Sequence, residues 1–172
     1  MVLPLSELEF LREVSNHRDL CRKLDRLGLS AAKAELQRQA FAVGVRWILL
    51  GQQHLKEARS AARGRSTRSA YSRAYYAAYN ASKAVRYVAS GAVSLKGDDH
   101  GKAPDLPGDF PDTAKWSASI TRLYEHRLKA DYDNWIDPTS KFTLRVPIAV
   151  QEASEFVSAC KRYLQDKHGI AI

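Results

Sequence analysis

The sequence has few cysteines and no long apolar run, and each shortage excludes a class of protein. The 172 residues include only two cysteines, Cys21 and Cys160, whose spacing fits neither a disulfide framework nor a metal-ligand motif. The longest apolar-rich run, 40–50, is interrupted by Gly44 and Arg46 and is too short to cross a bilayer. The first residues lack the cationic start and long apolar stretch of an export signal. We therefore expect a cytoplasmic protein with no membrane contact, no metal and no cofactor.

Acidic residues are scarce relative to basic ones, with 19 Asp and Glu against 27 Lys and Arg. The resulting formal charge of +8 favours polyanionic partners such as RNA, DNA or nucleotides. A hydrophobic fraction of 45% is too high for a wholly disordered chain, and the length suits one domain with its own core. We expect a single domain over residues 1–172.

Apolar residues recur at helical spacing along most of the chain, between capping residues and glycines. Ser6, with Glu9 three residues later, predicts a first helix that ends near Gly28, and Ser30 begins a second that reaches about Ala62. Three further helices are expected, from Ser66 or Thr67 to Gly91, from Asp112 or Thr113 to about Asp133, and from Pro147 onward.

Two segments lack the helical pattern. Ala92–Pro111 is rich in glycine, proline and aspartate, which is typical of a long loop. Lys141–Val146 alternates apolar and polar residues, but without a second strand to pair with it we treat it as extended loop. The fold class is therefore expected to be all-α, a bundle of about five helices with a long loop between the third and the fourth.

Three groups of residues are candidates for a functional site. The first is a row of tyrosines at a spacing of four, Tyr71, Tyr75 and Tyr79, set among alanines. The spacing alone favours a tight interface between helices, in which phenol rings fill space and hydroxyls reach the rim.

The second group is the segment His126-Arg127-Leu128-Lys129-Ala130-Asp131-Tyr132-Asp133. Arg127 and Asp131 lie one helical turn apart and can form an ion pair. Two interpretations stay open for this pair. Either it is an ordinary surface ion pair, or Arg127 contacts a phosphate while Asp131 orients the guanidinium.

The third group is a basic stretch in which Glu57 is the only acid. Its six cations suit either a solvated helix face or contact with phosphates, and arginine favours bidentate phosphate contact. They are Lys56, Arg59, Arg63, Arg65, Arg68 and Arg73.

Together these segments resemble a known superfamily. Ser72-Arg73-Ala74-Tyr75-Tyr76-Ala77 on one helix, His100 in the following loop and Arg127-x-x-Ala130-Asp131-Tyr132-Asp133 on a later helix are similar to the HEPN superfamily. The resemblance is to its small prokaryotic branch, with SRAYYA and R-x-x-ADYD motifs. It covers roughly 46–166 as a HEPN-like bundle and leaves 1–45 as an N-terminal helical extension.

The resemblance implies an up-and-down bundle that forms a homodimer. HEPN proteins act as metal-independent endoribonucleases in toxin–antitoxin, CRISPR and phage-defence systems, or bind nucleotides without cutting. Toxin members are often paired with a nucleotidyltransferase-type antitoxin. The catalytic residues implied here are Arg127, His126, Asp131 and His100. Contacts to nucleic acid or nucleotide are expected from Arg73, Tyr76, Asn80, Tyr132, Arg63, Arg65 and Arg68.

The chain departs from the superfamily's nuclease signature, which is Arg, four to six residues, then His, late in the bundle. Arg122 and His126 have only three residues between them, and Asn80 stands where many members of the branch have histidine. Two pairs elsewhere have the required spacing, Arg162 with His168 and Arg12 with His17. The sequence thus leaves three alternatives: an endoribonuclease, a non-catalytic module that binds a nucleotide or a partner protein, or a purely structural dimer.

Overall fold

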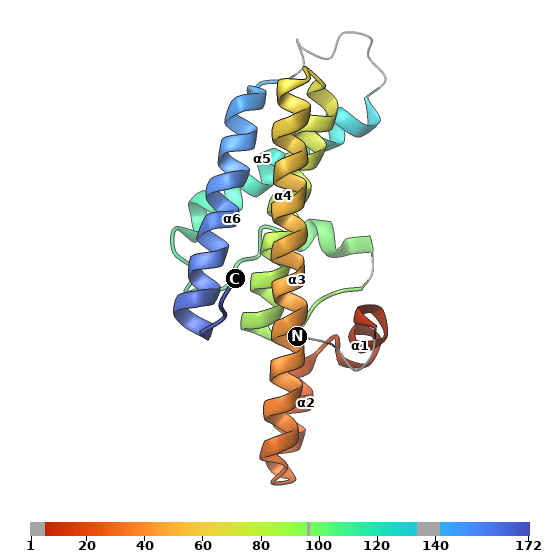
Figure 1. Ribbon diagram of the computed structural model, residues 1–172, viewed down its shortest axis with the longest axis vertical. Coiled ribbons are helices and arrows are strands. Elements are labelled where there is room, and N and C mark those ends of the chain that lie inside the picture. Colours follow the sequence, from red (N-terminus) through yellow and green to blue (C-terminus); the bar gives the residue numbers. More distant parts are fainter. Residues whose placement is uncertain (1–5, 96, 134–141) are drawn as a thin grey trace.

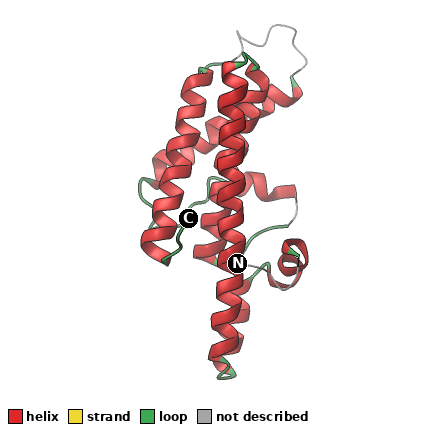
Figure 2. Ribbon diagram, viewed as in Figure 1, coloured by secondary structure: helices red, strands yellow, loops and turns green. Residues whose placement is uncertain are grey.

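The computed structural model describes residues 6–95, 97–133 and 142–172, and this part of the chain folds into helices joined by turns and loops (Figures 1 and 2). The helices are α1 (Glu7–Val14), α2 (His17–Arg26), α3 (Ser30–Arg63), α4 (Thr67–Ser90), the 3-10 helix η1 (Gly97–Lys102), α5 (Thr113–Tyr132) and α6 (Val146–His168). The described residues contain no strand, only an isolated bridge between Asn16 and Ala92. The expected all-α bundle is therefore confirmed.

Local signals set several of the helix ends. The Ser6 side chain accepts a hydrogen bond from the Glu9 backbone while the Glu9 carboxylate accepts one from the Ser6 backbone, which is the expected capping box. Gly28 and Gly91 follow α2 and α4 with positive φ angles of 69° and 74°, a conformation that glycine adopts at little cost. Pro147 lies in the first turn of α6, where its missing N–H is not needed.

The first expected helix is wrong in one respect, because it is divided into α1 and α2. Asn16 causes the break: its side chain accepts a hydrogen bond from the backbone of Asp19 at 3.2 Å and so begins a new helix. The backbone around Asn16 is then held to the end of α4 through the bridge to Ala92. The described residues accordingly contain six α-helices rather than five.

The two segments that lacked a helical pattern differ in outcome. The expected loop Ala92–Pro111 contains η1, which the glycines and aspartates of the sequence did not indicate. Lys141, the first residue of the other segment, lies outside the described residues. Residues 142–145 have no regular structure, and α6 begins at Val146.

α4 lies at the centre of the bundle and packs against α3, α5 and α6 (Figure 1). It runs antiparallel to α3, since Gly44 faces Val88 and Gly51 faces Ala77. A Cβ atom at Gly51 would stand 2.9 Å from the carbonyl oxygen of Ala77, so the glycine permits the close approach of the two helices. α3 continues without a break across residue 45, where the sequence suggested that an extension ends.

No helix in the described ranges combines the length and hydropathy required to cross a membrane.

Replacing Gly51 with alanine is expected to destabilise the protein by about 1–3 kcal/mol, because the methyl group would force the α3 and α4 backbones apart. Alanine is the better helix former, so a purely local effect would have the opposite sign. Urea unfolding measures the change. Gly64→Ala is the matched control, since the nearest atom to its added carbon would be 3.5 Å away. Equal midpoints for the two variants would contradict the prediction.

Candidate functional site

Arg127 on α5 contacts Tyr76 of α4 and two residues of its own helix, Asp131 and Tyr132. Its Nη2 donates a hydrogen bond of 2.8 Å to the Tyr76 hydroxyl, and the centre of its guanidinium lies 5.4 Å from the Tyr76 ring. Oδ2 of Asp131 lies 2.7 Å from its Nε, and the Tyr132 ring lies 5.1 Å from the guanidinium. Burial alone would lower the pKa of Arg127, but the hydrogen bond to Tyr76 and the charge of Asp131 raise it. The side chain is a fixed cation.

His100 on η1 lies beside the same tyrosines. Its ring stacks on Tyr79 with centroids 4.3 Å apart, and its Nδ1 lies 2.9 Å from the Tyr75 hydroxyl. Its ring also meets the edge of Tyr76, the residue that binds Arg127, at 5.9 Å. Burial, together with the charge of Arg127, lowers the pKa of His100, so the imidazole is neutral near pH 7. We call His100, Arg127, Asp131, Tyr132 and the three tyrosines Tyr75, Tyr76 and Tyr79 the Arg127 cluster.

A buried ion pair fixes the helix that carries His100. Asp99 is 2% exposed and accepts hydrogen bonds from Arg86 at 3.0 and 3.1 Å and from the Tyr79 hydroxyl at 2.8 Å. Lys83 lies 3.7 Å from the same carboxylate. Burial alone would raise the pKa of Asp99, but these donors and charges hold it below its ordinary value. Because Asp99 precedes His100, the pair holds the imidazole against α4.

Arg73 lies next to the Arg127 cluster, on the side that faces α3. Its Nε is 3.3 Å from a Glu57 carboxylate oxygen, and its Nη1 is 3.2 Å from Nδ1 of His54. The His54 ring in turn lies 5.7 Å from the Tyr76 ring. Arg73 is exposed, so its cation remains accessible beside the cluster.

His126 is not in the Arg127 cluster, although it is adjacent to Arg127 in the sequence. It is 2% exposed, and both ring nitrogens contact backbone groups. Nδ1 donates to the Arg122 carbonyl at 2.8 Å, and Nε2 accepts from the backbone N–H of Leu144 at 3.0 Å. Successive helical residues point about 100° apart, so His126 faces the segment before α6 while Arg127 faces α4.

The arginines of the basic stretch do not share one surface. Arg59 donates to Ser154 on α6, Arg68 donates to the Ala130 carbonyl on α5, and Arg73 pairs with Glu57. Arg63 and Arg65 are exposed at the turn between α3 and α4. Of the expected arginine contacts, Arg73 lies next to the Arg127 cluster, and Arg68 bonds to the Ala130 carbonyl, one residue before Asp131.

Asn80 lies at the interface between α3 and α4. It is 6% exposed, and its side-chain amide donates to the Tyr76 carbonyl at 2.8 Å. Its Cβ is also a neighbour of Gly51, where the helices are closest. Asn80 is thus a packing residue beneath the cluster.

The sequence did not point to His54 or Asp99, and for Tyr75 and Tyr79 it favoured packing between helices over a site role. His54 lies on a different helix from Tyr76, and only the crossing of α3 and α4 brings them together. Asp99 stands next to His100, but its buried partner Arg86 resembles any other helix cation in the sequence. The one available signal was the row of tyrosines, which indicated packing and not these hydrogen bonds.

In comparisons with known proteins, no family model, no curated protein and no solved structure matches the chain. Within the described residues, no group of three or more His, Cys, Asp or Glu side chains could hold a metal ion. The chemistry that the cluster offers is that of a fixed cation beside a neutral imidazole and aromatic rings.

Removal of the buried Asp99 carboxylate is expected to lower the free energy of unfolding. Asp99→Ala should destabilise the protein by about 3–5 kcal/mol, because Arg86 would remain buried without its partner. Chemical unfolding monitored by circular dichroism measures the loss. The neighbouring Asp98→Ala is the control, since Asp98 is exposed and pairs with Lys102 at the surface, and its midpoint should barely move.

The stability that Asp99 contributes should depend on pH. Its pKa is lower in the folded state than in the unfolded one, so the contribution is complete above the unfolded value of about 4 and is lost as pH falls through the folded value. Unfolding of wild type and Asp99→Ala at a series of pH values tests this. The difference in the free energy of unfolding between wild type and Asp99→Ala should become smaller from about pH 5 downward. A difference that became larger on acidification would contradict the assignment.

Proposed function

We propose that the protein is an RNA-directed member of the HEPN superfamily and a metal-independent endoribonuclease that acts at the Arg127 cluster. The observation that carries the proposal is the fixed cation of Arg127 beside the neutral imidazole of His100, with both residues in contact with Tyr76. This combination suits a phosphodiester, which needs a positive charge and a proton acceptor in the same place.

In the reaction, the 2′-hydroxyl of the RNA attacks the adjacent phosphorus. In the tautomer in which Nδ1 donates to the Tyr75 hydroxyl, Nε2 of His100 is a bare acceptor and takes the proton of the 2′-hydroxyl. Arg127 stabilises the negative charge that develops on the phosphate oxygens, and Asp131 holds the guanidinium in place. The bond to the 5′-oxygen breaks, which leaves a 2′,3′-cyclic phosphate and requires an acid to protonate the leaving oxygen. The imidazolium that forms on His100 supplies that proton, and a homodimer would place a second such set beside the same phosphate.

Binding of the nucleic acid is supported by the surroundings of Arg127. Tyr132 is 69% exposed and lies against the guanidinium, so its other face is open for stacking of a base. Arg73 offers a second cation close to the cluster, which suits a neighbouring phosphate. Both ring nitrogens of His126 are engaged with backbone groups, so we assign the role of general base to His100 and not to His126.

A second candidate function is a non-catalytic module that binds a nucleotide or a partner protein through the same cluster. One observation favours it: the His100 ring is stacked on Tyr79 and bonded to Tyr75, an arrangement that also serves to build a rigid binding surface. The exposed Tyr132 supports base stacking under either function.

The proposal extends to the setting that the HEPN resemblance implies. This comprises an up-and-down arrangement of the bundle over 46–166, a cytoplasmic homodimer, and a role in toxin–antitoxin or phage-defence systems. A nucleotidyltransferase-type antitoxin is the partner that this setting favours.

Purified protein is expected to cleave single-stranded RNA in the presence of EDTA. Arg127→Gln should slow cleavage by about 100-fold or more, because it removes the stabilising cation, and His100→Gln should slow it by about 100- to 10,000-fold. Arg122→Gln is the matched control on α5: Arg122 pairs with Glu152 at 2.6 Å, outside the cluster, so its rate should equal that of wild type. Intact RNA after long incubation with the wild-type protein would refute the proposed endoribonuclease activity.

The rate of cleavage should also depend on pH in one direction. Because the pKa of His100 is lowered, the rate should rise with pH through a value below the ordinary 6.5 of histidine and reach a plateau by about pH 7. Calorimetric titration with a 2′-O-methyl oligonucleotide, which has no attacking hydroxyl, separates binding from cleavage. Binding by wild type, lost in Arg127→Gln, without cleavage of ordinary RNA would favour the second candidate.

A further inference from the structure

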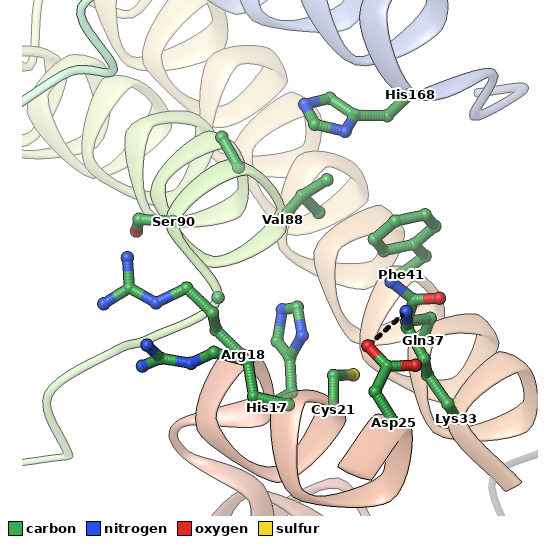
Figure 3. Close-up of a pocket in the computed structure, with 13 residues that line it drawn as sticks. His17, Arg18, Cys21, Asp25, Lys33, Gln37, Phe41, Val88, Ser90 and His168 are labelled. Atoms are coloured by element: carbon green, nitrogen blue, oxygen red, sulfur yellow. Dashed lines mark hydrogen bonds and ion pairs between the residues drawn. The ribbon is translucent and has the colours of Figure 1, made fainter. Parts of the chain in front are cut away.

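A second candidate site lies apart from the Arg127 cluster, between α2, the first half of α3, the end of α4 and the end of α6. It is a pocket of about 340 Å³, near the lower end of the range of about 300–1,000 Å³ that small-molecule sites occupy. None of its lining residues belongs to the Arg127 cluster. Figure 3 shows His17, Arg18 and Cys21 on one side and His168 on the other.

Two buried imidazole nitrogens at this pocket have no hydrogen-bond partner. They are Nδ1 of His17 and Nε2 of His168, from opposite ends of the chain. His17 is 5% exposed, so its unpartnered nitrogen is buried together with the rest of the side chain. A buried polar atom without a partner costs about 1–3 kcal/mol, and native proteins rarely leave one unexplained. A bound ligand would supply the hydrogen bond that is missing at His17.

The protonation of His17 defines what that ligand must offer. Nε2 lies 2.9 Å from the carbonyl oxygen of Tyr87, which can only accept, so Nε2 carries the hydrogen. Burial lowers the pKa of His17, which keeps the ring neutral, and Nδ1 is then a bare acceptor. The ligand must therefore present an N–H or O–H group to this nitrogen.

The charged side chains around the pocket indicate that the ligand also carries a negative charge. Lys33 is neutralised by Asp25 at 2.8 Å, and Arg22 pairs with Asp19. Among the described residues Arg18 forms no ion pair, so it leaves a positive charge at the pocket. That charge favours an anion.

The rest of the lining is mostly apolar, with Gln37 and Ser90 as its polar members. Phe41, Val88 and Ala89 line the pocket between the two histidines, and the Phe41 ring lies 6.1 Å from the His168 ring. Such walls suit a flat or aliphatic body.

We infer that this pocket binds a small organic anion that carries one N–H or O–H donor on an apolar body. The donor satisfies His17, the acidic group lies towards Arg18, and the body packs against Phe41 and Val88. The inference does not depend on ribonuclease activity.

The test uses the full-length protein and 4-hydroxybenzoate, which combines a carboxylate, an aromatic ring and a hydroxyl donor. Calorimetry measures affinity, and nuclear magnetic resonance follows the ring signals of His17 and His168. The probe should shift both sets of signals. Benzoate, which lacks the donor, and 4-hydroxybenzyl alcohol, which lacks the charge, should each bind at least tenfold more weakly.

Variants locate the site. Arg18→Gln should weaken binding of 4-hydroxybenzoate about tenfold, whereas Arg26→Gln, an exposed residue of the same helix that does not line the pocket, should leave it unchanged. His168→Phe keeps the ring but removes the nitrogen, and should weaken binding severalfold. The inference is overturned if no histidine signal moves at millimolar probe, if benzoate binds equally well, or if Arg18→Gln behaves like Arg26→Gln.

Discussion

The structure depends on hydrogen bonds from the tyrosines of α4 to the segments around it. Tyr71 donates to the Leu144 carbonyl before α6, Tyr76 accepts from Arg127 of α5, and Tyr87 donates to the Val14 carbonyl at the end of α1. Tyr75 and Tyr79 both hold η1, through His100 and Asp99. Between the tyrosines, alanines with no exposed surface let neighbouring helices approach closely; these are Ala70, Ala74, Ala77, Ala78, Ala81 and Ala84. One helix thus supplies both the core and the polar contacts that position the candidate site.

Much of the fold was predictable because its helix ends carry local signals. The capping box at Ser6 and the glycines that end α2 and α4 act within a few residues, so sequence spacing is enough to find them. The division between α1 and α2 was missed because Asn16 resembles any polar helix residue until its side chain is seen to cap the next helix. η1 was missed because it is held by Asp99 and Arg86, a contact between separate elements.

The candidate site was predictable only in part for the same reason. Arg127 and Asp131 are four residues apart, so the helix itself brings them together. The position of His100 depends on the folded path between α4 and α5, and that of His54 on the crossing of two helices. Conversely, neighbours in the sequence were separated. Arg59 lies on α3 and Arg68 and Arg73 lie on α4, and the latter two point to different sides of that helix.

The attachment of α1 and α2 has a consequence for dynamics. These helices are joined to α4 through the Tyr87 hydroxyl, the His17 ring and the bridge from Asn16 to Ala92. α1 also adds Phe10, Leu11 and Val14 to the apolar core, whereas α2 buries only His17 and Cys21. Because α2 buries few side chains, its free energy of local opening is low, and it separates before the rest of the fold. Since α2 supplies one wall of the His17 pocket, this sub-global opening would admit solvent and ligands to it, and a bound ligand would in turn slow amide hydrogen exchange throughout α2.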